Sequence, residues 1–188
     1  MDGAIARLDV LFVGYVGERV AGTVSLVRSG NVTAVVDPGM VPARSAILDP
    51  LAALGIDPAE VTDVILSHHH PDHTVNIALF ENARVQDHWA IYDKDRWDPR
   101  QAEGFEVAPG VELMETPGHT PQDITTLVTT EDGVAALTHL WWHERANTDP
   151  LAFDLDALHH NRAKVIEVAS LIVPGHGVSF VVDAQTPP

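Results

Sequence analysis

The residues best suited to chemistry lie in one short segment, Ser-His-His-His-Pro-Asp-His, at positions 67–73. Within it, His68, His70, Asp72 and His73 place three imidazoles and a carboxylate in six positions. Clustered imidazoles repel one another when charged and gain little from burial when neutral. A divalent ion reverses this balance, because neutral imidazole and carboxylate are good ligands for zinc and similar metals. The segment therefore predicts a metal site.

The spacing inside the segment predicts two ions rather than one. His68 and His70 are two residues apart, so in extended backbone their side chains point the same way and can bind one ion. Asp72 and His73 follow Pro71, where the chain must turn. They can therefore face a second ion on the other side.

The flanking residues place this motif at the end of a strand. Residues 61–66 form a β-branched run that predicts a buried strand, and residues 74–80 have a helical pattern. Open sheets of α/β proteins bind their ligands at the carboxyl ends of strands. The motif is therefore expected at such an edge.

Two further histidines lie in turn-like sequences, His119 in Thr-Pro-Gly-His-Thr and His176 in Pro-Gly-His-Gly. The chain has 11 histidines, so a solvated histidine-rich loop or a tag must be considered. A tag would lie at a terminus, not between a strand and a helix. We therefore expect a two-metal hydrolytic site.

The motif, its flanks and the later histidines resemble the metallo-β-lactamase-fold hydrolase superfamily over nearly the whole chain. Residues 35–39, Val-Val-Asp-Pro-Gly, are similar to an early strand of that family that ends in Asp and Gly. The resemblance implies that one ion is held by His68, His70 and His119. It implies that the other ion is held by Asp72, His73 and His176. Two zinc ions are expected, with one ion, iron or manganese as the alternatives.

One position departs from the family pattern. The family places an Asp that bridges both metals after the strand between the third and the last histidine segment. Here the matching strand, residues 134–138, is followed by His139. An imidazole can ligate one metal but does not bridge two ions as a carboxylate does. Either His139 is a ligand or it only packs at the strand end, and Glu144 or Asp149 is then a candidate for the missing carboxylate.

The resemblance implies a metal-dependent hydrolase that uses metal-activated hydroxide on a small ester, thioester, lactone or amide. Asp72 would bind a metal and orient the nucleophile or receive its proton, and Asp37 would brace the histidine loop. A nuclease is the second hypothesis. A mononuclear iron or redox enzyme, or a metal-binding protein without hydrolysis, is the third, because His139 stands where the bridging Asp is expected.

Charge and composition favour a small-molecule substrate. The formal net charge is −16, and lysines and arginines are scattered, whereas nucleic-acid binding needs clustered basic residues. The chain has no cysteine, which excludes disulfides, thiolate zinc sites and a cysteine nucleophile. It shows no signal peptide and no apolar run of membrane-spanning length, so we expect a cytoplasmic protein without membrane partners. The oligomeric state is left open, a homodimer included.

The hydrophobic pattern predicts strands in each half of the chain with helices outside, an α/β (α+β) protein with an αββα sandwich. A length of 188 residues predicts a single domain over 1–188. Strands are predicted over residues 8–16, 21–28, 32–36, 111–115, 124–130, 134–138 and 170–173, and helices over residues 43–54 and 155–169. Residues 87–104 are expected to form either a flap beside the site or an edge strand whose tryptophans pack on the core. Trp141 and Trp142, next to His139, are expected to wall the pocket.

Overall fold

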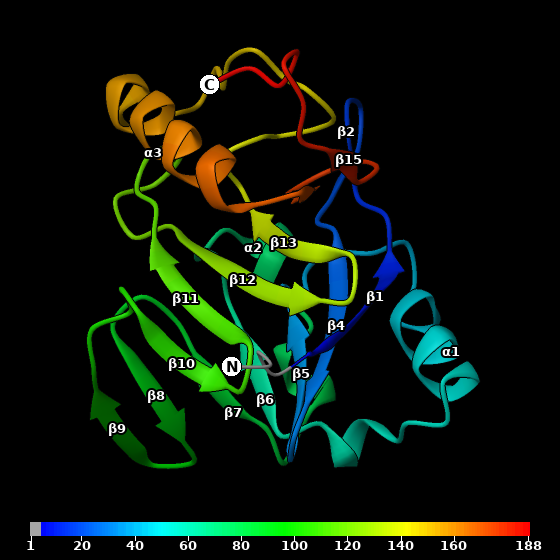
Figure 1. Ribbon diagram of the computed structural model, residues 1–188. Helices are drawn as coiled ribbons and strands as arrows, with labels where there is room; N and C mark the ends of the chain where they lie inside the picture. The colour runs from blue at the N-terminus through cyan, green and yellow to red at the C-terminus, as the bar shows by residue number, and fades with distance from the viewer. Residues whose placement is uncertain (1–4) are drawn as a thin grey trace.

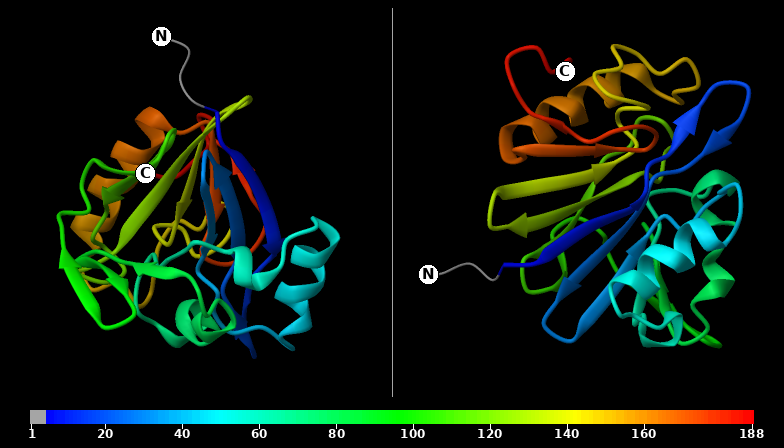
Figure 2. Two further views of the ribbon diagram at one scale, coloured as in Figure 1. Left: turned by 90° about the horizontal axis from the view of Figure 1, so that it is seen from below. Right: turned by 90° about the vertical axis from the view of Figure 1, so that its right-hand side faces the viewer.

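The computed structural model describes residues 5–188 and shows two β-sheets packed face to face, with helices on their outer faces (Figures 1 and 2). The first sheet has the strand order β1-β4-β5-β6-β7-β8-β9. Its strands are β1 (Arg7–Phe12), β4 (Val24–Ser29), β5 (Val32–Val36), β6 (Asp63–Ile65), β7 (Arg84–Gln86), β8 (Ala90–Asp93) and β9 (Arg96–Pro99). In this sheet β5, β6 and β7 are parallel to one another, and the outer pairs are antiparallel.

The second sheet is built from the other half of the chain in the order β10-β11-β12-β13-β14-β15. Its strands are β10 (Phe105–Ala108), β11 (Val111–Glu115), β12 (Ile124–Thr130), β13 (Gly133–Thr138), β14 (Leu171–Pro174) and β15 (Phe180–Val181). Here β13 and β14 are parallel. A separate short hairpin, β2 (Tyr15–Val16) and β3 (Val20–Ala21), projects from the first half.

The helices lie outside the two sheets. They are α1 (Ser45–Ala53), α2 (Pro71–Thr74), α3 (Leu155–Val168) and the 3-10 turns η1 (Pro58–Glu60) and η2 (Ile77–Leu79). Figures 1 and 2 show α1 and α3 on opposite sides of the sandwich. The αββα architecture expected from the sequence is confirmed. Within residues 5–188, no helix has both the length and the apolar character needed to cross a bilayer.

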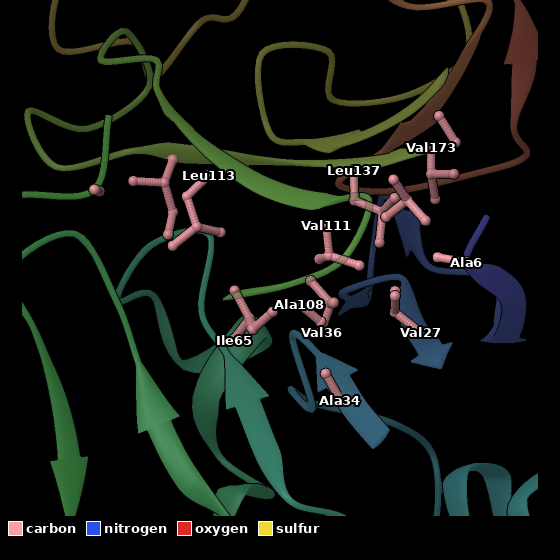
Figure 3. Packing of buried hydrophobic residues seen from close by; sticks show 14 residues of the cluster. Ala6, Val27, Ala34, Val36, Ile65, Ala108, Val111, Leu113, Leu137 and Val173 are labelled. Atoms are coloured by element: carbon pink, nitrogen blue, oxygen red, sulfur yellow. The ribbon is translucent and has the colours of Figure 1, made fainter. Parts of the chain in front are cut away.

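Apolar side chains alternate between the two faces of the central strands. Those on one face fill the space between the sheets, and those on the other fill the space under the helices. Ile65 of β6 points inward and packs with Val111 and Leu137 of the second sheet (Figure 3). Its neighbours Val64 and Leu66 point outward and are buried under α1. Because both faces of these central strands are buried, the backbone at their ends is held firmly, and the site lies at those ends.

Two elements differ from the sequence prediction. The helix expected over residues 74–80 is instead the short α2, which begins at Pro71, followed by η2. Proline is well suited to the first helical position, since it needs no backbone donor there. The long strand expected over residues 8–16 bends at Gly14, where a Cβ would lie 2.5 Å from the Ala21 carbonyl oxygen. The chain therefore starts the β2–β3 hairpin at that point.

Residues 87–104 form the β8–β9 hairpin at the edge of the first sheet, which agrees with the edge-strand alternative. The expected packing of its tryptophans on the core is wrong. Trp89 is 47% exposed and Trp97 is 64% exposed. The strand β9 has the sheet on one side only, so its side chains are left at the surface.

Candidate metal centre

Six histidines and one aspartate meet where the two sheets join. The His68–His73 motif follows β6, and the other three histidines follow strands of the second sheet. His119 follows β11, His139 comes directly after β13, and His176 follows β14. The carboxyl ends of strands from two sheets therefore bring residues more than 100 positions apart to one point, the edge at which α/β sheets bind their ligands.

One set of donor atoms comes from His68, His70 and His119. The Nε2 atom of His68 and the Nε2 atom of His119 each lie 3.0 Å from Nδ1 of His70. All three nitrogens point to a common centre. His68 and His119 are buried, at 1% and 4% exposure, while His70 is open to solvent. This set has one accessible side.

A second set comes from Asp72, His73 and His176. The Oδ2 atom of Asp72 lies 3.6 Å from Nε2 of His73 and 3.5 Å from Nε2 of His176. Both histidines are buried, at 0% and 2% exposure. The carboxylate is partly exposed, so it can be reached by a substrate.

His139 lies between the two sets. Together with His68 and His119 it forms one group of potential ligand atoms within 4.8 Å of one another, and with His73 and His176 it forms a second such group. Its ring stacks on that of His119 at a centroid distance of 4.1 Å, and its Nε2 lies 3.2 Å from Nε2 of His176. The site therefore contains an imidazole where the family resemblance implies a carboxylate.

Gly175 makes room for this imidazole. A Cβ atom at position 175 would lie 2.3 Å from Cδ2 of His139, so any larger residue would displace the ring. The backbone carbonyl of Gly175 also accepts a hydrogen bond from the Thr23 amide. A side chain at this position would therefore disturb both halves of the site.

Hydrogen bonds on the far side of three of the rings fix which nitrogen faces the centre. Nδ1 of His73 contacts Oδ2 of Asp37 at 3.0 Å, and Nδ1 of His119 contacts Oδ2 of Asp149 at 2.6 Å. Nδ1 of His176 donates to the carbonyl oxygen of Ala21 at 2.8 Å. Such partners orient a metal-binding histidine and select its tautomer.

Asp37 holds the histidine motif in place, as expected from the sequence. Its Oδ1 accepts the Ser67 amide at 2.7 Å and its Oδ2 accepts the Ser67 hydroxyl at 2.6 Å, in addition to the contact with His73. Asp37 itself has a φ of 53°, a left-handed conformation that is uncommon outside glycine. The strand end is thus bent so that one carboxylate reaches both the backbone and a ring of the motif.

Four of the six imidazoles are held in their neutral form. Burial, followed by the neighbouring histidines, lowers the pKa of His68 and of His139 well below the usual value. Burial also lowers the pKa of His70 and His176. Neutral imidazole is the form that binds a metal, so these rings need not lose a proton to become ligands.

Within residues 5–188, two buried nitrogens of the centre have no hydrogen-bond partner, which bears on whether the centre fits a metal. Among the described residues, Nε2 of His73 and Nδ1 of His139 have no hydrogen-bond partner although both atoms are buried. Leaving such a group unsatisfied costs about 1–3 kcal/mol. His73 Nε2 faces the second donor set, so a divalent ion bound there would satisfy it. The donor set, seven atoms of imidazole and carboxylate type, fits zinc, iron or manganese.

The two carboxylates considered for the bridging position lie elsewhere. Glu144 is exposed. Asp149 is buried, at 1% exposure, but it contacts the outer nitrogen of His119 rather than the centre. Burial would raise the pKa of Asp149, but the hydrogen bonds from His119 and the Leu151 amide outweigh it, so the pKa lies below the usual value. Asp149 is therefore ionised and positioned to orient His119.

Both Trp141 and Trp142 were expected to line the site, but only Trp142 does. The ring centroid of Trp142 lies 6.0 Å from the ring centroids of His119 and His176 and 6.2 Å from that of His139. Trp141 is fully buried in the core against Phe180 and does not face the centre. Because Trp141 belongs to the core cluster under α3, only Trp142 of the pair lines the site.

An αββα sandwich with clustered histidines at the joined strand ends defines a class of metal-dependent hydrolases, and comparison with known proteins agrees. The family model of the metallo-beta-lactamase superfamily matches residues 17–182. The chain is 33% identical to Metallo-beta-lactamase domain-containing protein 1 of Xenopus laevis, over 96% of this chain and 83% of that protein. It is 31% identical to an N-acyl homoserine lactonase of a Bacillus species, over 45% of this chain and 40% of that protein.

The fold agrees with these sequence matches. A crystal structure of a metallo-beta-lactamase from Thermotoga maritima superimposes with a TM-score of 0.76 at 20% identity, covering 94% of this chain and 99% of that one. The chain belongs to the metallo-beta-lactamase superfamily and is a metal-dependent hydrolase of that superfamily.

The particular resemblance is to Metallo-beta-lactamase domain-containing protein 1. The short chain and the ending Pro-Gly-His-Gly-x-x-Phe at residues 174–180 indicate it, and the match to the Xenopus laevis protein confirms it. This chain spans between 58% and 83% of the length of the vertebrate proteins of that name that it matches.

Proposed function

We propose that this hydrolase holds two divalent ions, zinc in the first instance, and cleaves a small acyl compound. The first ion would be bound by His68, His70 and His119, and the second by Asp72, His73 and His176. The observation that carries the proposal is the convergence of these donor atoms, with the outer nitrogens of His73, His119 and His176 already engaged. His139 would add a ligand to the second set, since its Nε2 lies beside that of His176.

A bound divalent ion lowers the pKa of water toward 7 and polarises an acyl oxygen, so that no serine or cysteine nucleophile is required. Asp72 would accept, at the carboxylate oxygen that does not bind the ion, the proton released as water attacks, because this carboxylate belongs to the second set and is partly exposed. Asp37 and Asp149 would keep His73 and His119 oriented. Trp142 would exclude bulk water from one side.

The reaction needs no further reactant. Water adds to the acyl carbon, the bond from that carbon to oxygen, sulfur or nitrogen breaks, and the leaving group takes a proton. Esters, thioesters, lactones and amides all fit this scheme, and the Bacillus relative is named as a lactonase. The charge of −16 disfavours nucleic acid, whose phosphates require basic residues for binding.

A second candidate function rests on one residue. Because His139 stands at the expected bridging position, a single ion, iron in particular, would favour redox chemistry over hydrolysis of an acyl group. The single-domain organisation over residues 1–188 and the cytoplasmic location remain predictions from the sequence.

Metal analysis and a substrate panel test the proposal together. Protein purified without added metal should contain two zinc ions per chain. It should cleave members of a panel of esters, thioesters and lactones, lose activity on chelation and regain it with zinc. Single-stranded RNA and DNA are tested as substrates at low salt to examine the alternative, a nuclease. Cleavage of nucleic acid at low enzyme concentration, or one iron per chain, would overturn the proposal.

A further inference from the structure

A pocket beside the centre has no role in the ligand set. It has a volume of about 450 Å³ and opens between the β2–β3 hairpin and the loop that follows β13. In Figure 1 this hairpin and the loop lie near the top of the molecule. The main lining residues are Val16, Gly17, Trp142, Ala146, Thr148 and Pro150.

The pocket adjoins the donor atoms through one side chain. Trp142 lines it, and the same ring stands within 6.2 Å of His119, His139 and His176. The backbone carbonyl of Trp142 also accepts the His176 amide at 2.6 Å, which fixes this part of the loop to the centre. The indole therefore borders both the donor atoms and the pocket, so that part of a molecule reacting at the centre would lie against it on the way to the pocket.

The chemistry of the lining selects the kind of group that can enter. Among the described residues that line the pocket there is no Asp, Glu, Lys or Arg. A carboxylate or phosphate would find no opposite charge there, and burying an unpaired charge is costly. Val16, Ala146 and Pro150 instead offer aliphatic surface, and Trp142 offers an aromatic face. The polar members are the uncharged Thr148 and Asn147 and the exposed His143.

We propose that this pocket binds an uncharged aliphatic acyl chain of the substrate, and so makes the enzyme selective for medium-length over short acyl groups. This rests on the proposed acyl hydrolysis and narrows its substrate class. Burial of each methylene group strengthens binding about threefold to fourfold. A six-carbon chain has four methylenes more than a two-carbon chain, so its advantage in kcat/KM should be about 80- to 250-fold if all four are buried.

Gly17 offers a direct way to fill the pocket. A Cβ at this position meets no atom of the described chain within 4 Å, and the residue is not among those with positive φ. Leucine can therefore be placed there without backbone strain. The matched controls are Gly17→Ala, which adds little volume, and Glu18→Leu, which puts the same side chain at the next, exposed position outside the lining.

The experiment compares p-nitrophenyl acetate with p-nitrophenyl hexanoate in the zinc-loaded protein and its variants. In the natural protein and both controls, kcat/KM for hexanoate should exceed that for acetate about 80- to 250-fold if the whole chain is buried. In Gly17→Leu this ratio should fall about tenfold or more, with the zinc content still at the natural value. An unchanged ratio in Gly17→Leu, or an equal fall in Glu18→Leu, would overturn the proposal.

A binding measurement separates this pocket from the proposed reaction. Calorimetry with acetone and 2-octanone, which are uncharged and cannot be hydrolysed, reports on chain binding alone. Tighter binding of 2-octanone that is lost in Gly17→Leu supports the pocket even if no ester is cleaved, in which case the proposed reaction is wrong. Ester hydrolysis without any dependence on chain length, together with equal ketone binding, rejects the pocket and leaves the reaction standing.

Discussion

Replacing Asp149 tests whether a carboxylate outside the proposed ligand set controls metal affinity. Asp149 is 1% exposed, and its Oδ2 lies 2.6 Å from Nδ1 of His119. It keeps Nε2 of that ring directed at His70. If His119 is a ligand, a weaker partner at Nδ1 should loosen the first ion without removing its site.

The expected magnitude follows from the type of hydrogen bond. A bond to a charged acceptor contributes about 1.5–3 kcal/mol, and one to a neutral acceptor about 0.5–1.5 kcal/mol. Asp149→Asn keeps the size and a neutral acceptor, so the affinity for the first ion should fall about tenfold. Asp149→Ala removes the bond and should approach the 100-fold loss that is typical when such an orienting partner is removed.

Metal-stripped protein should be titrated with zinc in competition with a chromogenic chelator, which yields a dissociation constant for each ion. Asp87→Asn is the matched control. Asp87 is also 1% exposed and contacts a histidine, His69, at 3.0 Å, but that ring lies outside the donor sets. The control should leave both constants within about twofold of the natural values.

Two outcomes would refute this reasoning. If Asp149→Ala binds both ions as tightly as the natural protein, the orientation of His119 does not limit affinity. If either variant binds only one ion at saturating zinc, Asp149 is itself a ligand and its assigned role is wrong. Circular dichroism of each variant shows whether the fold is retained.

Three further predictions concern the same centre. His68→Ala should reduce the metal content and abolish hydrolysis, and full retention of two ions by mass spectrometry would contradict the ligand assignment. His139→Asp should place a carboxylate between the two donor sets and tighten the second ion, so a chelator titration that shows weaker binding would reject the alignment at β13. Lowering the pH from 7.5 to 5.5 should destabilise the metal-free protein by about 1.4 kcal/mol for each of His68 and His139, measured by urea unfolding. Their folded pKa values lie well below 6.5, so the folded state binds fewer protons, and stability is full above pH 6.5 and lost as the pH falls. Asp123, whose pKa burial raises to about 6, opposes this trend only in part, and no loss of stability at pH 5.5 would contradict the neutral buried state of the two rings.

The fold was largely predictable because its strands carry strong local signals. Runs of β-branched residues bounded by turn residues predicted β5, β6, β11, β12, β13 and β14 within one or two positions. The boundaries that failed depend on contacts between distant segments. Gly14 ends a strand because the β3 backbone passes close by, and Pro71 starts a helix one turn earlier than the apolar pattern suggests.

The residues of the centre were predictable from their types and spacing, but their partners were not. Asp149 lies in an irregular loop, and nothing in its local sequence indicates that it reaches His119 across 30 positions. The contact between His176 and the Ala21 carbonyl spans 155 positions and involves a main-chain atom that carries no sequence signal. Trp141 and Trp142 are adjacent and of the same type, so only the tertiary packing shows which of them is buried in the core.

Because the donor atoms come from both sheets, neither half of the chain can hold an ion alone. Each proposed set joins residues after β6 in the first sheet to histidines of the second, so an ion bound there would act as a cross-link between the halves. Metal binds such a site only when the sandwich is closed, and it therefore stabilises the closed form by mass action. The supply of metal would then determine how long the folded chain resists proteolysis, in addition to its effect on the rate of substrate turnover.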